Sequence, residues 1–309
     1  MTIHRTLRAT LCLASLCPAA LSAATATVNP GQSIQAALDA VGNAGGGTVY
    51  VQPGNYDITA SLKVPNNTRL KGVTTRPVIT MAANADKPVI LPKTVPFTAV
   101  TCDYLSLNGG LTNAQMDAGT YWGAVGIQFG GGNNGTAGYI YNCNMTNCTA
   151  GVVMGYVTDG LMQGVNITNC GCTGTTTPGM HNVYISNTDP FRASYCTSTY
   201  CRTGMGFKIT DFYGDRTETS QIVDHCNFSN NQGGRGTAIY DISPIVFKNN
   251  TCDNNTQSGI NMIRCGNVTL TDNHATGNPD QADVSYDIWL NNCTATTISG
   301  NVYGTKRGF

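Results

Sequence analysis

The feature that most constrains the fold is a repeat that starts at about residue 100 and continues toward the end of the chain. Its first part is an apolar strand ending in Asn or Cys, which occurs at 139–148, 161–170, 192–201, 222–231, 246–255 and, more loosely, 269–278. Its second part is a short alternating strand, which occurs at 126–129, 151–154, 182–185, 206–209, 238–241, 259–262 and 287–290. Copies of this second strand start 21 to 32 residues apart. Such a period is typical of solenoids, and β-branched or aromatic strands between Gly and Asn turns indicate a β solenoid.

The composition agrees with a β-rich chain that turns often. The sequence has one Glu against 16 Asp, 31 Asn and 36 Gly. Because Glu favours helices and Asn and Gly favour turns, a mostly helical protein is not expected. Intrinsic disorder is disfavoured by a hydrophobic content of 41% and a net charge of zero. No basic excess is present to neutralise phosphates, so we expect no nucleic-acid partner.

Residues 1–23 have the layout of a secretory signal peptide. Arg5 and Arg8 precede the apolar run 11–16, and small residues follow up to Ala24. This run is too short to span a bilayer, and no later stretch is long and apolar enough. We therefore expect a secreted or periplasmic protein that does not associate with membranes. The mature part, 24–309, is expected to be a monomer with a single β-helix domain.

Stacked coils place equivalent residues in ladders along the axis. One predicted ladder is formed at a corner by Asn147, Asn169, Asn230 and Asn254, with Tyr200 in the intervening coil. Two more contain cysteine: Cys148, Cys170 and Cys201 in one, and Cys143, Cys196 and Cys226, with Val165 between them, in the other. Export permits disulfides, and neighbouring coils would bring these cysteines within range. The alternative is that they are packed as small apolar thiols.

The N-terminal segment adds a cap to this pattern. Apolar residues at 34, 37, 38 and 41 form a helical stripe, and a strand at 48–51 follows. A short helix there would cover the open end of the solenoid. Residues 33–72, SIQAALDAVGNAGGGTVYVQPGNYDITASLKVPNNTRLKG, resemble the opening of right-handed parallel β-helix proteins of the pectate-lyase-like superfamily.

The resemblance implies an all-β fold, a single-stranded right-handed parallel β-helix with a short N-terminal capping helix. Residues 24–72 would then form the cap and the first coils. The superfamily includes polysaccharide lyases, glycoside hydrolases, uronate epimerases, phage depolymerases and non-catalytic members. Since one fold supports many activities, the reaction has to be argued from individual residues.

The alternating strands predict which side chains face outward. If the flanking apolar residues of each strand point into the core, the central residue points out. This outward row is predicted to be Gln128, Val153, Tyr184, Lys208, Tyr240, Asn261 and Trp289. At 238–241 the pattern would place Asp241 inward, which indicates a bulge or register shift. Aromatic faces stack on sugar rings, so the row suits a polysaccharide lying along the sheet.

Much of the scarce charge of this sequence lies near the same three coils. We consider Lys208, Tyr184, His181, Arg202 and Arg235 as candidate catalytic residues. The candidate substrate-binding residues are Tyr240, Asp211, Asp241, Asp189, Arg192, Asn261 and Trp289. A lyase for an acidic polysaccharide needs a base to remove the proton beside the uronate carboxylate, and cations or amide donors to stabilise the developing charge.

Lys208 or Tyr184 is the expected base, with His181 as a rival. Arg202 and Arg235 are expected to hold the carboxylate. No cofactor is required by this scheme. Calcium is an alternative to the arginines, held by Asp211, Asp215 or Asp241, but the sequence does not define a metal site. The expected function is a secreted lyase that cleaves an acidic polysaccharide by β-elimination.

Three other functions stay open. A hydrolase needs two carboxyl groups, and only the first sequence block of the polygalacturonase-like hydrolases is matched, by Asn187-Thr188-Asp189. Of the Asp-Pro-His-Asp site of mannuronan epimerases, only Asp189-Pro190 is present. The third alternative is a non-catalytic β-helix that binds carbohydrate.

Overall fold

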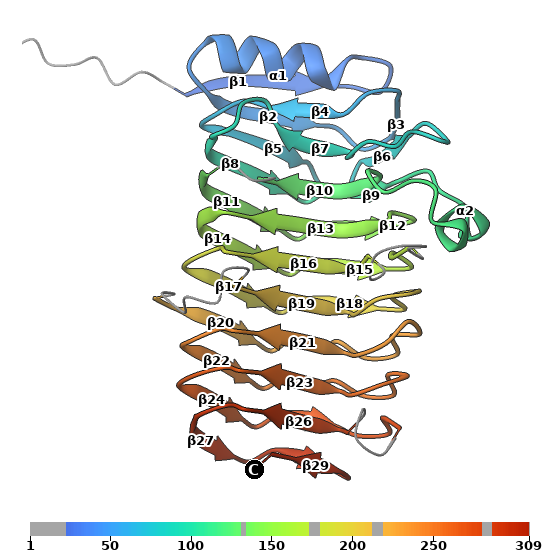
Figure 1. Ribbon diagram of the computed structural model, residues 1–309. Helices are drawn as coiled ribbons and strands as arrows, with labels where there is room; N and C mark the ends of the chain where they lie inside the picture. Colours follow the sequence, from blue (N-terminus) through green and yellow to red (C-terminus); the bar gives the residue numbers. More distant parts are fainter. Residues whose placement is uncertain (1–22, 131–133, 173–179, 212–218, 280–285, 309) are drawn as a thin grey trace, which may run out of the picture.

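The chain winds into one long solenoid in which each coil lies on the previous one (Figure 1). The computed structural model describes residues 23–130, 134–172, 180–211, 219–279 and 286–308. The predicted signal peptide therefore lies almost wholly outside the described residues, as does Asp215. Among the described residues, all pairings between neighbouring strands are parallel, and the register shifts only between β24 and β27, at Val268 and Thr269, which confirms the predicted parallel β-helix.

Three parallel sheets run along the solenoid, and we call them sheets I, II and III. Sheet I consists of β4 (Leu62–Val64), β7 (Ile90–Pro92), β10 (Val125–Phe129), β13 (Ala150–Gly155), β16 (Val183–Ser186), β19 (Phe207–Thr210), β21 (Thr237–Tyr240), β23 (Ile260–Ile263), β26 (Ile288–Asn291) and β29 (Lys306–Arg307). Sheet II consists of β1 (Ala24–Val28), β2 (Gly47–Val51), β5 (Thr68–Gly72), β8 (Thr98–Asp103), β11 (Gly135–Tyr141), β14 (Val157–Gln163), β17 (Phe191–Ser194), β20 (Gln221–Asp224), β22 (Ile245–Lys248), β24 (Val268–Thr271) and β27 (Ala295–Ser299).

Sheet III is shorter. It consists of β3 (Asn55–Ile58), β6 (Val78–Met81), β9 (Ser106–Asn108), β12 (Asn144–Thr146), β15 (Asn166–Thr168) and β18 (Thr197–Thr199). Isolated bridges continue it from coil to coil, and they join Thr197 to Asn227, Asn227 to Thr251, and Thr251 to His274. Beyond them, β25 (His274–Ala275) pairs with β28 (Val302–Tyr303). Each complete coil thus contributes one strand to sheet II, then sheet III, then sheet I.

The predicted capping helix is confirmed. Helix α1 (Ile34–Asn43) begins after Ser33, whose hydroxyl accepts a hydrogen bond from the backbone N–H of Ala36. Its buried residues are Ile34, Leu38 and Val41. The helix lies across the N-terminal end of the solenoid (Figure 1). It therefore covers backbone groups of the first coils that no earlier coil is there to pair.

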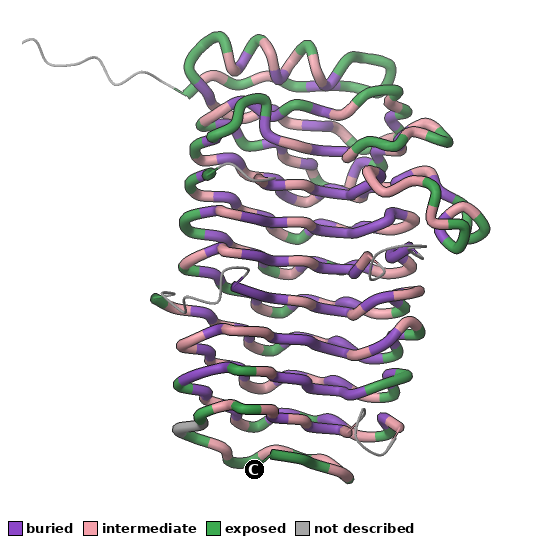
Figure 2. Tube along the Cα trace, viewed as in Figure 1, coloured by how far each residue is buried: buried purple, intermediate pink, exposed green. Residues whose placement is uncertain are grey.

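Along many strands, buried residues alternate with half-buried or exposed ones (Figure 2). The predicted inward residues of sheet I, including Ile127, Val183 and Met262, are all buried in one continuous core. Phenylalanine rings contact one another across the core, at centroid distances of 6.3 Å for Phe191 and Phe207 within one coil and 5.0 Å for Phe207 and Phe228 of successive coils. In register, however, Phe207 lies between Val183 and Thr237, so large and small side chains alternate along the axis at this position.

The prediction for the coil at 238–241 was wrong by two residues. In register with Lys208 and Asn261 lies Ala238, whereas Tyr240 pairs with Thr210 in the neighbouring outward row. Asp241 does not point inward. It adopts a left-handed conformation (φ 59°) at the corner after β21. The inward positions are taken by Thr237 and Ile239, and the Thr237 hydroxyl bonds to the Gly259 carbonyl at 3.4 Å, so a polar inward residue is accommodated.

The corner ladder of asparagines is confirmed. Asn147, Asn169, Tyr200, Asn230 and Asn254 all have positive φ, between 52° and 58°. The amide of Asn169 donates to Asn147 across one coil at 2.8 Å. Asparagine tolerates this left-handed geometry better than most residues, and Tyr200 adopts it at the same corner of an intervening coil.

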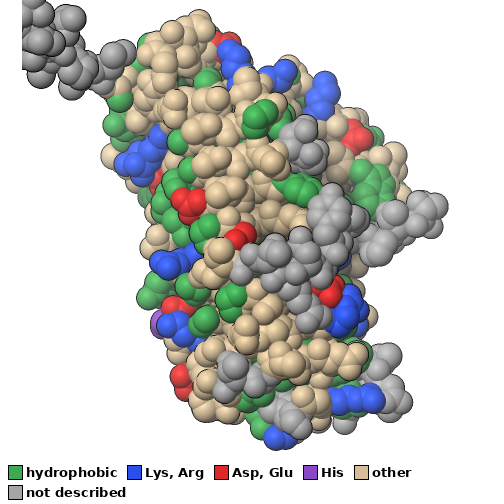
Figure 3. Space-filling view, turned by 60° about the vertical axis from the view of Figure 1, so that its left-hand side comes forward, with side chains coloured by type: hydrophobic (Ala, Val, Ile, Leu, Met, Phe, Trp, Pro, Cys, Tyr) green, Lys and Arg blue, Asp and Glu red, His purple; other side chains and the backbone are tan. Residues whose placement is uncertain are grey.

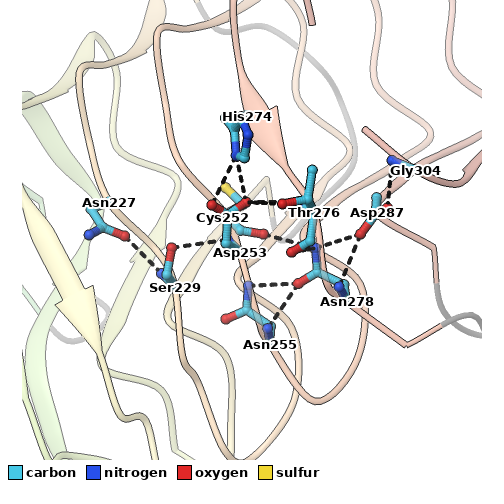
Figure 4. A network of polar contacts seen from close by, with 10 residues as sticks. All are labelled: Asn227, Ser229, Cys252, Asp253, Asn255, His274, Thr276, Asn278, Asp287 and Gly304. Atoms are coloured by element: carbon cyan, nitrogen blue, oxygen red, sulfur yellow. Dashed lines mark hydrogen bonds and ion pairs between the residues drawn. The ribbon is translucent and has the colours of Figure 1, made fainter. Parts of the chain in front are cut away.

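A second, buried ladder of asparagines continues the ladder that contains Cys201 toward the C-terminus, since the Cys201 backbone N–H donates to the Asn231 side-chain oxygen. The Asn255 side-chain oxygen accepts from both the backbone N–H and the amide of Asn231, at 3.0 and 2.9 Å. Asn255 in turn donates to Asn278, which donates to Asp287 (Figure 4). Beside it, Asp253 accepts from the Thr276 N–H and contacts the His274 ring. These bonds satisfy polar backbone at a turn that is shut off from water.

All eleven cysteines of the described chain are free thiols, so the structure contains no disulfide among them. Cys148, Cys170 and Cys201 are fully buried, as are Cys102 and Cys143. Burial raises the pKa of the Cys143 thiol to about 12. The packed-thiol alternative therefore describes this structure.

We predict that Asn255→Ala lowers the free energy of unfolding by about 2–4 kcal/mol, because the backbone N–H of Asn231 would stay buried without its acceptor and the Asn278 side-chain oxygen would lose a donor. Urea denaturation would measure this loss. The matched control is Asn166→Ala, at an exposed position on β15. A control change as large as that of Asn255→Ala would contradict a structural role for the buried ladder.

Candidate functional site

The candidate site lies on the outer face of sheet I, where a lysine contacts two tyrosines. Lys208 on β19 is in register with Tyr184 on β16. Its Nζ lies 5.1 Å from the ring centroid of Tyr184 and 5.7 Å from that of Tyr240. The sequence grouped these three residues correctly, although Tyr240 reaches the lysine diagonally from the adjacent row. We call Tyr184, Lys208 and Tyr240, together with His181 and Arg235, the Lys208 cluster.

Burial shifts the pKa values of Lys208 and Tyr184 in opposite directions. Burial lowers the pKa of Lys208, because a partly dehydrated ammonium is less stable than a neutral amine. Burial raises the pKa of Tyr184, since the phenolate is the charged form of that group. Lys208 is thereby the better base of the two, and Tyr184 keeps its proton.

His181 is fixed as a neutral ring beside the lysine. It is 7% exposed, and its ring centroid lies 5.9 Å from that of Tyr184. Its Nδ1 accepts a hydrogen bond from the Met205 backbone N–H at 3.0 Å, so the neutral ring carries its proton on Nε2. Burial and the charge of Lys208 lower its pKa to about 3. His181 is therefore a hydrogen-bond donor and a poor base, which argues against its predicted role as a rival to Lys208.

Arg235 is held on the other side of the cluster. Its Nη1 donates to the Tyr240 hydroxyl at 3.0 Å, and its guanidinium carbon lies 6.0 Å from the ring centroid of Trp289. Trp289 is in register with Asn261, which is fully buried. The structure thus brings together Lys208, Tyr184, His181, Arg235, Tyr240, Asn261 and Trp289 on one face.

Arg202 is held in an ion pair of its own. Its guanidinium contacts both carboxylate oxygens of Asp117, at 2.6 and 2.7 Å, and only 19% of its side chain is exposed. Asp117 belongs to helix α2 (Asn113–Ala118), which projects from the solenoid between β9 and β10 (Figure 1). The expectation that Arg202 holds a substrate carboxylate does not fit this pairing.

Helix α2 is not among the elements predicted from the sequence. A signal for it was present, because Thr112 and Gln115 form a capping box at its start. Pairing between Asp117 and Arg202 joins residues that are 85 positions apart, and no local pattern indicates such a contact.

Asp211 and Asp241, two of the three aspartates considered for calcium, lie at the corner that follows sheet I. Asp211 is buried and accepts from the Asn187 amide at 3.0 Å. Asp241 forms a two-pronged ion pair with Arg264, with both distances 2.6 Å. Within the described ranges, no three metal-ligating side chains gather in one place. The described part of the chain therefore offers no ready-made calcium site, and Asp215 lies outside it.

Asp189 and Arg192 lie away from the Lys208 cluster. Asp189 accepts hydrogen bonds from the backbone N–H groups of Thr219 and Ser220, at 2.8 and 3.2 Å, which ties two neighbouring coils together. Arg192 is exposed on β17, in sheet II. Neither residue shares a face with Lys208, so the structure does not bring them to the candidate site.

Charge on the side of the molecule shown in Figure 3 is dispersed. On the side shown in Figure 3, basic and acidic side chains form small groups along the whole solenoid, and neither sign makes a continuous surface. Among the helices that the structure describes, none is long and apolar enough to cross a membrane.

The fold and this outer face place the chain among the right-handed β-helix proteins. The model of the family "Right handed beta helix region" matches residues 118–303, which is more than half of the chain, and the protein belongs to this family. No curated protein sequence matches the chain.

Solved structures show the same fold at low sequence identity. The A-module of mannuronan C-5 epimerase AlgE6 from Azotobacter vinelandii has a TM-score of 0.55 and 18% identity, with 89% of this chain and 84% of that chain covered. The AlgE4 A-module from the same organism has a TM-score of 0.55 and 16% identity, with 87% and 85% covered. DFA-IIIase from Arthrobacter chlorophenolicus A6 has a TM-score of 0.52 and 10% identity, with 75% and 58% covered.

The neutral His181 predicts how stability depends on pH. Its pKa falls from 6.5 to about 3 on folding, so the unfolded chain binds the extra proton between these values. The free energy of unfolding that His181 contributes is complete above pH 6.5 and is lost as the pH falls toward 3. In this range the free energy of unfolding changes by at most about 1.4 kcal/mol per pH unit through this residue. His181→Asn, whose side-chain oxygen can accept the Met205 N–H, removes that slope.

Urea denaturation of wild type and variant between pH 7 and 4 would measure the difference. His274→Asn is the control, because the His274 side chain is 47% exposed. Equal pH dependence of the wild type and His181→Asn would show that His181 is not held neutral.

Proposed function

We propose that the protein is a polysaccharide lyase that cleaves an acidic, uronate-containing polysaccharide by β-elimination on sheet I. The observation that carries this proposal is the position of Lys208, half-buried between the rings of Tyr184 and Tyr240 with a lowered pKa. An amine that loses its proton more readily than a free lysine is suited to act as a general base.

The reaction would follow from the protonation states of the cluster. Neutral Lys208 removes the proton on the carbon beside the uronate carboxylate, and the electrons of that C–H bond move to the carboxylate as an enolate. The Nε2–H of His181 donates to the developing negative charge. The electrons then return to form a carbon–carbon double bond as the bond to the leaving oxygen breaks. Tyr184, whose pKa is raised by burial, supplies the proton to that oxygen.

Carbohydrate recognition is supported by the aromatic rings of the same face. Tyr184, Tyr240 and Trp289 are half-buried on sheet I, so part of each ring remains open to a sugar. Two solved structures with similar folds are also named as enzymes of an acidic polysaccharide, mannuronan. We therefore take a polyuronate as the substrate class.

A second candidate is C5 epimerisation of a uronate. It shares the first proton abstraction and differs in the next step, because the proton is returned to the opposite face of the same carbon and no bond to the leaving oxygen breaks. The two mannuronan C-5 epimerase A-modules with similar folds favour this alternative.

Incubation with pectate, alginate and glycosaminoglycans would test the proposal. We expect ultraviolet absorbance of an unsaturated uronate to increase with at least one of them, and Lys208→Ala to lower that rate at least about 100-fold, since general-base catalysis contributes about that much or more. Lys208→Arg is the matched control, because it keeps a cation between the tyrosines but provides no base at neutral pH.

The other outcomes separate the alternatives. Exchange of solvent deuterium into the polymer without cleavage would indicate an epimerase. New reducing ends without ultraviolet absorbance would indicate a hydrolase. Binding that survives Lys208→Ala, with no change to any polymer, would indicate a carbohydrate-binding β-helix.

The pH dependence of cleavage tests the role of Lys208 separately. Because the base must be neutral, kcat/KM is expected to rise about tenfold per pH unit and to level off below the ordinary lysine value of 10.5. In Tyr184→Phe, kcat/KM should level off at the same pH as in the wild type, because Lys208 sets that pH, while the maximal rate falls. A value of kcat/KM that stays constant from pH 6 to 9 would exclude Lys208 as the base.

A further inference from the structure

One asparagine on the candidate face has no role in holding the solenoid together. Asn261 on β23 points outward, because its neighbours Ile260 and Met262 are core residues. It is nevertheless fully buried, and among the described residues neither its Nδ2 nor its Oδ1 has a hydrogen-bond partner. An unpaired buried amide costs about 1–3 kcal/mol per group, so it calls for a physical explanation.

The buried ladder shows how this fold satisfies an asparagine when the amide is structural. Asn255 receives and donates bonds to equivalent asparagines in the coils on both sides. Asn261 has different neighbours in register, Ala238 on one side and Trp289 on the other. Ala238 offers no polar side-chain atom, and no bond joins Asn261 to Trp289. The stacking of coils therefore does not require an amide at this position.

A second unsatisfied group lies on the same part of the face. The Nε of Arg235 is buried and has no partner in the part of the chain that the structure describes, while its Nη1 donates to the Tyr240 hydroxyl. The guanidinium also lies over the Trp289 ring, next to Asn261 in register. A guanidinium edge and an amide thus share one small region, and an aromatic ring lies beside both. Two donors near an aromatic face match the carboxylate of a sugar whose ring stacks on the indole.

We propose that Arg235 and Asn261 form a subsite for the carboxylate of a second uronate, distinct from the sugar that reacts at Lys208. This inference rests on the proposed polyuronate substrate. Asn261 is two strands from Lys208, a backbone separation of about 10 Å, which exceeds the length of one sugar ring. Arg235 donates to the carboxylate through its fork, and Asn261 donates through Nδ2 and accepts a sugar hydroxyl at Oδ1.

Binding at this subsite requires a local rearrangement. Because Asn261 is fully buried, the groups that cover it have to shift before a ligand reaches the amide. The Arg235 bond to Tyr240 is exchanged for the charge-assisted bonds to the carboxylate, which are stronger than bonds to a neutral hydroxyl. The enzyme would thereby select chains that carry a carboxylate away from the reacting sugar as well as on it.

The test compares binding of an acidic oligosaccharide with binding of its carboxyl-reduced form. Oligogalacturonate and oligoalginate are used as probes, each before and after carboxyl reduction, with isothermal calorimetry in a Lys208→Ala background so that no probe is cleaved. Asn261→Leu removes both amide atoms at nearly constant volume, and Asn261→Asp keeps the shape but adds negative charge. Unfolding temperatures are recorded for both variants and for Asn255→Leu.

For one of the acidic probes, we expect Asn261→Leu and Asn261→Asp each to lower the affinity at least tenfold and the reduced form to be little affected. We also expect Asn261→Leu to raise the unfolding temperature and Asn255→Leu to lower it, since only Asn255 has partners to lose. An unchanged preference for the acidic probes would overturn the subsite, as would an equal loss for acidic and reduced forms. Binding is measured without turnover, so an absence of lyase activity in the wild type would refute the proposed reaction and leave this test of the subsite intact.

Discussion

The in-register hydrogen bonding between successive coils is the constraint on which the whole structure depends. Because each strand pairs in parallel with its equivalent in the coils before and after, any residue type placed at one position faces the same position of its neighbours. Each buried side chain therefore has to pack against the equivalent positions of the coils on both sides, as Phe207 does between Val183 and Thr237. In the ladders these neighbours are alike: Cys226 lies beside Cys196, and Asn255 both accepts from and donates to asparagines of the adjoining coils.

The outer face of sheet I is where this repetition stops. Along one row the residues are Tyr184, Lys208, Ala238, Asn261 and Trp289, and no two are alike. Stacking does not demand this variety, and part of it is unfavourable, since burial destabilises the charged form of Lys208 and leaves the Asn261 amide unpaired. A regular core of apolar coils can offset these local costs. Unfavourable polar groups on a rigid support are typical of sites at which binding or chemistry takes place.

Backbone geometry then sets the chemical states of the site. The Met205 N–H occupies Nδ1 of His181, so the proton of the neutral ring lies on Nε2. Arg235 is drawn toward Tyr240 and Trp289, while Arg202 is neutralised by Asp117 from the projecting helix α2. One of the two arginines near this face is thus available to a ligand and the other joins α2 to the solenoid.

The sequence by itself determined the fold, because the repeating coils of a parallel solenoid require a repeating pattern of residues in the sequence. The alternating strands identified core residues such as Ile127 and Met262, the asparagine corners, the aligned thiols, and the region of Lys208 as the place where charge and aromatic rings gather. Only the tertiary structure decided four other features. These are the register at 237–241, the pairing of Arg202 with Asp117, the separation of Asp189 and Arg192 from the site, and the lack of a partner for the Asn261 amide among the described residues. The physical reason is that periodicity specifies which face a residue occupies, whereas partners across coils depend on where each corner turns and on how long each insertion is.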